Sequence, residues 1–355
     1  MSTIRANTIQ DASGGSNAQL FGVASPPNSM GFRNRIINGD MRIDQRNNGA
    51  SVSPTASQYT LDRWNAIMNA SGAKYSVQRN AGSVTPPTGF SNYIGATSLG
   101  AYTVTAGEIM ALQQAIEGFN ISDLAWGTAN AQAVTLSFWV RSSLTGTFGG
   151  AIRQGSGARA YPFSYTISAA NTWEFKTVNI PGDTSGTYAS DNTAGLLLSF
   201  GMGVGSTFSG TAGAWAGSNF VSATGATSVV GTNGATLYIT GVQLEAGTVA
   251  SPFERRDYGR ELIMCQRYYE VLIASGSNFL LFPGAIDFAR NSYPFKITKR
   301  ATPTIAGGSG GAEGGGSWTP SYQASGVETW SISAFLGSSL IRPVLNGPVT
   351  ASIEL

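Results

Sequence analysis

The best candidate binding residues in this sequence are a tryptophan and an arginine two positions apart in one strand-like segment. In AVTLSFWVRSS, apolar residues at 134, 136, 138 and 140 alternate with polar or amphipathic ones at 135, 137, 139 and 141. Successive side chains of a strand point to opposite faces, so Trp139 and Arg141 are expected on the face opposite the core. An indole there can stack on a sugar ring, or another strand, loop or subunit can cover it.

Other candidate ligand-binding residues are aromatic side chains in segments rich in small residues. Trp126 and Trp215 lie in predicted connections, and loops carry binding residues more often than strands do. Trp318 and Tyr322 lie just after the glycine-rich stretch 307–317. These four join Trp139 and Arg141 as candidate glycan contacts, whereas Trp64 and Trp173 are expected in the core.

Several kinds of catalytic site are excluded by residue type alone. The chain has no histidine and a single cysteine, Cys265, which excludes Ser-His-Asp triads, Cys-His pairs, intrachain disulfides and His-based metal sites. A pair of carboxylates could still hydrolyse a glycoside, but the 19 acidic residues form no motif tied to that chemistry. We therefore expect a non-enzymatic protein without a cofactor or metal site. A calcium ion held by oxygen ligands stays open, although no clustered acidic motif supports it.

The composition argues against nucleic acid and membranes as partners. Charged residues make up 11% of the 355 residues, the net charge is +2, and no long basic run occurs, so we expect no nucleic-acid binding. The sequence contains no stretch of about 18 apolar residues, so no membrane span is predicted. The N-terminus lacks a signal-peptide pattern. A neutral surface rich in Gly, Ser and Thr suits glycans, which are mostly uncharged.

Short alternating segments and frequent turn signals predict an all-β fold, a β-sandwich or barrel. Residues 106–120 fit a strand or a helix, and their β-rich neighbourhood favours the strand. Residues 203–235 carry no charge and predict either a functional loop or an excursion held by Phe208, Trp215 and Phe220.

The end of the first β-rich region predicts a bulge followed by a helix. In LYITGVQLE the apolar parity changes at Gly241, and a bulge there would keep all four apolar residues inward. Asp257 is a plausible N-cap for a short helix whose buried face is predicted at Tyr258, Leu262, Cys265 and Tyr269. The adjacent PFERR is expected to form an ion-pair cluster rather than a sulfate or phosphate site.

Four segments resemble tail fibres or receptor-binding proteins of tailed bacteriophages, especially those of marine bacteria and cyanobacteria. MSTIRANTIQDASGGSN resembles their N-terminal arm, and NRIINGDMRIDQRNNGASV with YTLDRW resembles the opening strands of a jelly roll similar to carbohydrate-binding modules. AVTLSFWVRSSLTGTF with TWEFKTVNIPGDTSGTY resembles its central strands. ATLYITGVQLEAGTVASPFERRDYGRELIMCQRYYE resembles its last strand and helical exit.

The resemblance implies a homotrimeric virion protein, located in a tail or baseplate fibre and made in the host cytoplasm. It implies contact with other virion proteins through residues 1–30 and with host surface polysaccharide through the β domains. The expected organisation is an arm and linker at 1–30, a jelly-roll β-sandwich at 31–255, a linking helix at 256–270 and a smaller C-terminal β domain at 271–355.

Three functions remain open at this point. The leading hypothesis is a non-catalytic fibre that binds host glycan during adsorption. The alternatives are a polysaccharide depolymerase of the tail and a structural connector or decoration protein without glycan binding.

Overall fold

The computed structural model describes residues 19–20, 23–24, 33–273, 288–312, 317–318, 320–335 and 343–355. Contacts divide the chain into two compact units. Unit 1 comprises 1–42, 49–60 and 64–255, and unit 2 comprises 43–48, 61–63 and 256–355. The arm predicted at 1–30 lies outside the described residues, apart from the two-residue strands β1 (Gln19–Leu20) and β2 (Val23–Ala24).

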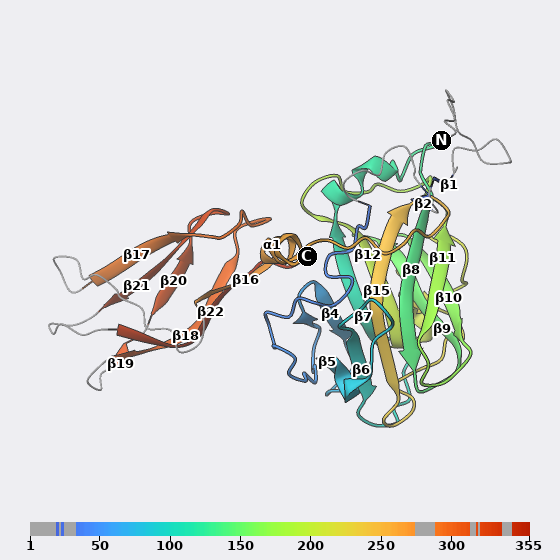
Figure 1. Ribbon diagram of the computed structural model, residues 1–355, viewed down its shortest axis with the longest axis horizontal. Coiled ribbons are helices and arrows are strands. Elements are labelled where there is room, and N and C mark those ends of the chain that lie inside the picture. The colour runs from blue at the N-terminus through green and yellow to red at the C-terminus, as the bar shows by residue number, and fades with distance from the viewer. Residues whose placement is uncertain are drawn as a thin grey trace, which may run out of the picture. The chain divides into compact units, whose positions relative to one another are not determined.

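Unit 1 is a jelly-roll β-sandwich of two antiparallel sheets (Figure 1). The six-stranded sheet has the order β10 (Ala160–Ile167), β9 (Gly146–Gln154), β12 (Ala194–Val204), β7 (Ile109–Glu117), β4 (Trp64–Met68) and β3 (Gln58–Leu61). The five-stranded sheet has the order β11 (Glu174–Ile180), β8 (Val134–Ser142), β15 (Thr236–Ala246), β6 (Ile94–Ser98) and β5 (Tyr75–Arg79).

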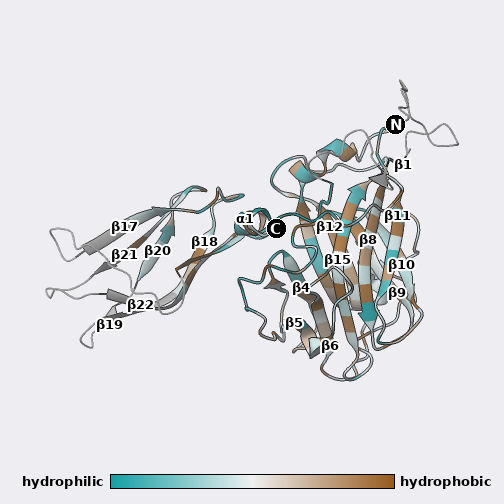
Figure 2. Cartoon of the chain, in the orientation of Figure 1, coloured by the Kyte–Doolittle hydropathy of each residue, from teal (hydrophilic) through white to brown (hydrophobic). Residues whose placement is uncertain are grey.

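The core lies between the inner faces of these two sheets. Apolar and polar residues alternate along the strands (Figure 2). The four apolar residues of β8 are fully buried, and the Phe138 ring lies 5.0 Å from that of Phe200 on the opposite sheet. Trp64 is also fully buried, and residues 109–117 form β7. The predicted face of 134–140, the core position of Trp64 and the strand predicted within 106–120 are therefore confirmed.

A β-bulge at Gly241 keeps β15 facing the core along its whole length. The pairing with β8 gains one residue between Thr240 and Gln243, and Gly241 has φ +60°. Leu237, Ile239, Val242 and Leu244 are consequently all fully buried, as the change of parity predicts.

Beyond the bulge, β15 pairs with an irregular buried segment, residues 34–39, instead of with β6. The backbone N–H of Val242 donates to the Gly39 carbonyl, and that of Arg35 donates to the Leu244 carbonyl. The Asn34 side chain accepts from the N–H of Leu244 and donates to the carbonyl of Val242. On the other side, the Gln114 amide both donates to and accepts from the Ile37 backbone. Buried backbone groups need such partners, so side-chain amides replace a strand here.

Gly39 has no room for a side chain, which gives a direct test of this packing. A Cβ at residue 39 would lie 2.2 Å from the Val242 carbonyl oxygen. We expect Gly39→Ala to lower the free energy of unfolding by about 3 kcal/mol, because backbone on both sides must move. Urea denaturation measures this loss. Gly100→Ala, where nothing lies within 4 Å of the new Cβ, is the control and should change stability by less than about 0.5 kcal/mol.

The predicted excursion at 203–235 packs on the outer face of the six-stranded sheet. It contains η4 (Ser206–Phe208) and the parallel pair β13 (Ser209–Gly210) and β14 (Ser222–Ala223), and β14 contacts β9, β10 and β12. A cavity of about 50 Å³ between this segment and β12 is lined mainly by Gly, Ser, Ala and Thr. It has room for a water molecule or two, but not for a sugar.

Unit 2 is a smaller β structure of two sheets. One has the order β16 (Tyr269–Ile273), β22 (Pro343–Ser352), β18 (Thr304–Ala312) and β19 (Ser317–Trp318), and the other β17 (Phe288–Pro294), β21 (Thr329–Phe335) and β20 (Ser321–Ala324). Its apolar core includes Ile273, Phe295, Trp330, Ile332 and Val349.

The helix of unit 2, α1 (Tyr258–Gln266), begins as predicted, since the Asp257 side chain accepts from the N–H of Arg260. Cys265 is buried as expected. The rest of the predicted face is only partly confirmed, since Leu262 is half-buried but Tyr269 lies beyond the helix in β16 and Tyr258 is 56% exposed. Glu261 and Gln266 are buried instead. The reason is that Glu261 pairs with the buried Arg256, which turns a polar edge of the helix inward. Within the described residues, no helix is long and apolar enough to span a membrane.

A buried charge cluster joins three separate segments of unit 2. Arg46 and Arg63 both form ion pairs with Glu354, and their guanidinium groups stack on Tyr269 and Tyr268. Asp62 instead accepts from the backbone and side-chain nitrogens of Gln45, at 2.7 and 2.6 Å. Burial raises the pKa of the Asp62 carboxyl to about 6, despite these hydrogen bonds.

The raised pKa of Asp62 predicts a pH dependence of stability. Between its ordinary pKa of 3.8 and about 6, the folded state binds more protons than the unfolded state. The contribution of Asp62 to the free energy of unfolding should therefore increase as the pH falls from 7 towards 4. Carboxyl-carbon NMR on aspartate-labelled protein should show one group titrating near pH 6, and Asp62→Asn should remove it. A carboxyl at residue 62 that titrates below pH 4.5 would contradict this.

Candidate functional site

The outer face of the five-stranded sheet carries a concentration of aromatic side chains. Trp139 on β8 lies between Phe175 on β11 and Thr240 on β15 as cross-strand neighbours. Its ring is 5.4 Å from that of Phe175, and Phe175 is 47% exposed. Trp139 itself is half-buried, so the two rings form a partly open apolar surface on the side away from the core.

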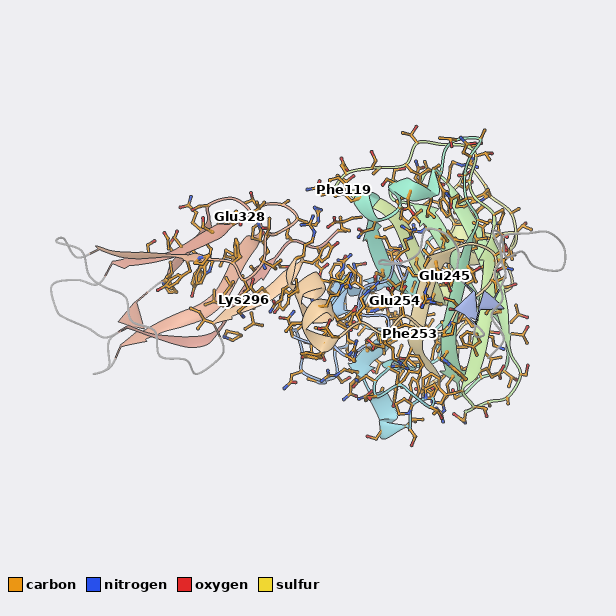
Figure 3. All side chains as sticks on the ribbon, turned by 45° about the horizontal axis from the view of Figure 1, so that its top comes forward. Phe119, Glu245, Phe253, Glu254, Lys296 and Glu328 are labelled. Carbon is orange, nitrogen blue, oxygen red and sulfur yellow. The ribbon has the colours of Figure 1, made fainter. Side chains whose placement is uncertain are left out.

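Phe90 extends this surface because Gly241 leaves space for its ring. A Cβ at residue 241 would lie 2.7 Å from the Phe90 ring and 3.2 Å from the Trp139 ring. Phe90 in turn makes an edge contact, at 5.2 Å between ring centroids, with Phe253, which is labelled in Figure 3. We call the four residues Phe90, Trp139, Phe175 and Phe253 the aromatic face.

A second, better-buried aromatic group lies beside the aromatic face. Tyr93 and Tyr238 are buried with Ala81, and Trp173 packs edge-on against Tyr93 at 5.4 Å. The Tyr93 hydroxyl donates to the Ala81 carbonyl and accepts from the N–H of Val84. Burial raises its pKa. This small layer lies on the outer face, so the prediction that Trp173 belongs to the sandwich core is wrong. Trp173 and Phe175 share a face, as expected, but it is the outward one.

Two arginines adjoin these rings. The Arg141 guanidinium lies 5.4 Å from the Tyr238 ring centroid, and its Nε donates to the carbonyl of Asn171 at 3.0 Å. The Arg255 guanidinium lies 4.8 Å from Phe90 and 5.7 Å from Phe253. The two arginines of PFERR therefore differ in their contacts. Arg256 pairs with Glu261, but Arg255 stacks on rings instead.

Trp126 and Trp215 are brought together by the fold, although neither offers a free ring. Their rings meet edge to face at 5.3 Å, and each also contacts a tyrosine, Tyr188 and Tyr161 respectively. Both indole N–H groups donate to backbone carbonyls, those of Gln132 and Pro181. Trp126 is 6% exposed. The expectation that Trp126 contacts a ligand is corrected, because burial leaves no face for stacking, and half-buried Trp215 completes the same cluster.

A buried aspartate stabilises this tryptophan cluster. Asp183 accepts from the Arg159 guanidinium, the Tyr188 hydroxyl and the N–H of Ser185. Burial alone would raise the pKa of Asp183, but these hydrogen bonds together hold it below its usual value. The same arrangement raises the pKa of Tyr188, mainly through burial. These contacts give Asp183 a structural role in the cluster.

Of the two C-terminal candidates, only Tyr322 has a described side chain. Trp318 is in β19, and its side chain lies outside the described residues. Tyr322 on β20 is half-buried against the core of unit 2, and burial raises its pKa to about 12. Tyr322 is therefore better placed for packing than for binding.

The outer face of the six-stranded sheet is polar and covered. Arg153 is 7% exposed and donates to Gln113 and to Asn219 of the covering segment. Burial lowers the pKa of Arg153 to about 10.

Over the described ranges, no group of three or more Cys, Asp or Glu residues is placed to hold a metal ion. Among the sequence candidates whose side chains the structure describes, Trp139 and Arg141 lie beside the open aromatic face. Phe90, Phe175, Phe253 and Arg255 were missed, and only the outward parity of Phe175 with Trp173 could have signalled one of them.

Comparison with known proteins finds distant structural likenesses only. No protein-family model matches the chain, and no curated protein matches it. One similar structure is the enzymatically active domain of bacteriophage CBA120 tailspike protein 4 (14% identity, TM-score 0.30), covering 60% of this chain and 21% of that one. A structure described as CBM4 (16% identity, TM-score 0.30) covers 59% and 98% respectively.

A putative sugar binding protein from Bacteroides thetaiotaomicron (14% identity, TM-score 0.35) covers 61% of this chain and 100% of that one. The chain thus spans about a fifth of the tailspike chain and the full length of the sugar binding protein. At these identities and TM-scores, the likenesses assign no function.

The contrast between the two tryptophan environments gives a stability prediction. Trp126→Ala should lower the free energy of unfolding by about 3–5 kcal/mol, because it opens a cavity in a buried cluster. Trp139→Ala should cost no more than about 1.5 kcal/mol, because less apolar area leaves solvent there on folding. Urea denaturation of both variants measures the difference. Equal losses would mean that Trp139 is a packing residue as well.

Proposed function

We propose that this protein binds a glycan through the aromatic face of unit 1, without catalysing a reaction. The observation that carries the proposal is the half-buried Trp139 beside the 47% exposed Phe175 on the side of the sheet away from the core. A soluble fold gains nothing from leaving two large rings accessible at adjacent positions unless they meet a partner.

Sugars fit this surface for a physical reason. The C–H groups on one side of a pyranose ring are apolar and can stack on an aromatic ring, while its hydroxyls need polar neighbours. Amphipathic rigid rings supply such contact area at low conformational-entropy cost. Arg141 and Thr177, which is exposed two positions along β11 from Phe175, supply donors and acceptors beside the rings.

We further propose that the glycan belongs to a host cell surface and that the protein is a bacteriophage tail fibre. The support is the sequence resemblance at the arm, the jelly-roll strands and the helical exit. In that setting the chain is a homotrimer anchored through residues 1–30, and three copies multiply a weak single-site affinity. Locating the protein in intact virions by cryo-electron tomography with a specific antibody fragment tests this part.

Glycan binding is tested by a glycan array followed by titration calorimetry with the best ligand. Trp139→Ala and Phe175→Ala should each weaken binding about tenfold or more while the protein stays folded, because each removes part of a stacking surface. Tyr322→Ala of unit 2 is a matched aromatic control and should leave the affinity unchanged. Full affinity in both aromatic-face variants would move the site elsewhere.

The same ligand separates the alternative functions. A depolymerase would shorten the bound polysaccharide on prolonged incubation, which size-exclusion chromatography detects. A connector or decoration protein would show no saturable binding to any glycan. Saturable binding with an unchanged chain length supports the proposed function.

A further inference from the structure

We infer that the aromatic face takes an anionic glycan, one that bears a carboxylate or a sulfate ester, because the two arginines beside it form no ion pair with any acidic residue that the structure describes. This inference rests on the proposed function and adds the class of ligand. It departs from the composition of the chain, which with few charges suggests a neutral sugar.

Arg255 is held in place without a counter-ion. Its guanidinium stacks on Phe90 and Phe253, and the absence of a side chain at Gly89 lets it approach the backbone, since a Cβ there would lie 2.9 Å from one terminal nitrogen. Arg255 is exposed and takes part in no ion pair with a described residue. None of its five N–H donors forms a hydrogen bond to a described residue.

Arg141 is similarly positioned on the other side of Trp139. One hydrogen bond from Nε to the Asn171 carbonyl and the Tyr238 ring orient the guanidinium. The two terminal nitrogens have no partner among the described residues. Arg141 and Trp139 are alternate residues of one strand, so their side chains emerge about 7 Å apart on the same face.

The acidic residues closest in sequence and sheet position are engaged elsewhere. Glu174 pairs with Lys176 and accepts from two backbone N–H groups of the 168–169 turn. Glu245 is 2% exposed and holds Ser251 and Gln243. Glu254 accepts from the N–H of Asn34 (Figure 3). None forms an ion pair with Arg141 or Arg255, so neither guanidinium has an acidic partner within the part of the chain that the structure describes.

This arrangement matches the chemistry of an acidic sugar. A guanidinium presents parallel N–H donors that fit the two oxygens of a carboxylate or sulfate, and such charge-assisted hydrogen bonds are stronger than neutral ones. A neutral glycan would leave both charges without a partner. An acidic one satisfies them while its ring stacks on Trp139 or Phe175.

The test uses the full chain and an array that contains uronate-bearing, sulfated and neutral oligosaccharides, including oligogalacturonates and their methyl esters. The bound set should be anionic, and esterification or desulfation should weaken binding. Arg141→Gln and Arg255→Gln should each reduce affinity about tenfold for the anionic ligand, and added salt should reduce the difference. Preference for uronates over sulfated glycans, or the reverse, identifies the anionic group.

Lys74→Gln is the matched control, since it removes one cation that stacks on Tyr102 outside the aromatic face. It should leave affinity unchanged. If the bound glycans are neutral, or if both arginine variants keep full affinity while Trp139→Ala loses it, the inference is overturned and glycan binding stands. If no glycan on the array binds, both the inference and the proposed function are contradicted.

Discussion

The bulge at Gly241 is the constraint on which most of unit 1 depends. One extra residue in β15 lets four apolar side chains on both sides of the bulge face the same core. It also divides β15 into a part that pairs with β6 and a part that pairs with the buried segment 34–39. A strand of fixed parity would turn either Leu237 and Ile239 or Val242 and Leu244 towards solvent. Glycine provides the φ of +60° that this geometry needs.

The same glycine shapes the aromatic face on the opposite side of the sheet. Because residue 241 has no side chain, the rings of Phe90 and Trp139 converge above it. The core and the candidate site are thus coupled through one backbone position. Any side chain at residue 241 would both strain the bulge and push the rings of Phe90 and Trp139 apart. This coupling explains why an apolar surface of this kind can persist at a central strand, where its supporting backbone is rigid.

Burial of polar groups is the second organising feature, and it distinguishes structural from binding residues. Asn34, Gln114 and Asp183 are buried with hydrogen-bond partners on several sides, and each stabilises backbone or a charged neighbour. Arg141 and Arg255 differ because rings and backbone orient them while their remaining donors face solvent. Unpaired charge at an oriented position is a feature of recognition surfaces, whereas fully satisfied charge is a feature of a framework.

The sequence by itself determined the all-β class, the inward face of 134–140, the bulge, the helix N-cap and the outward position of Trp139 with Arg141. These follow from strand periodicity and local backbone chemistry, which act over a few residues. Only the tertiary structure decided which rings meet. Phe90, Trp139, Phe175 and Phe253 are far apart in the chain and converge through strand order. For the same reason Trp126 becomes buried and Trp215 half-buried. It also assigned residues 43–48 and 61–63 to unit 2, where Arg46 and Arg63 pair with Glu354. Ion pairs and ring contacts between residues far apart in the chain produce no local periodicity, so sequence patterns could not predict them.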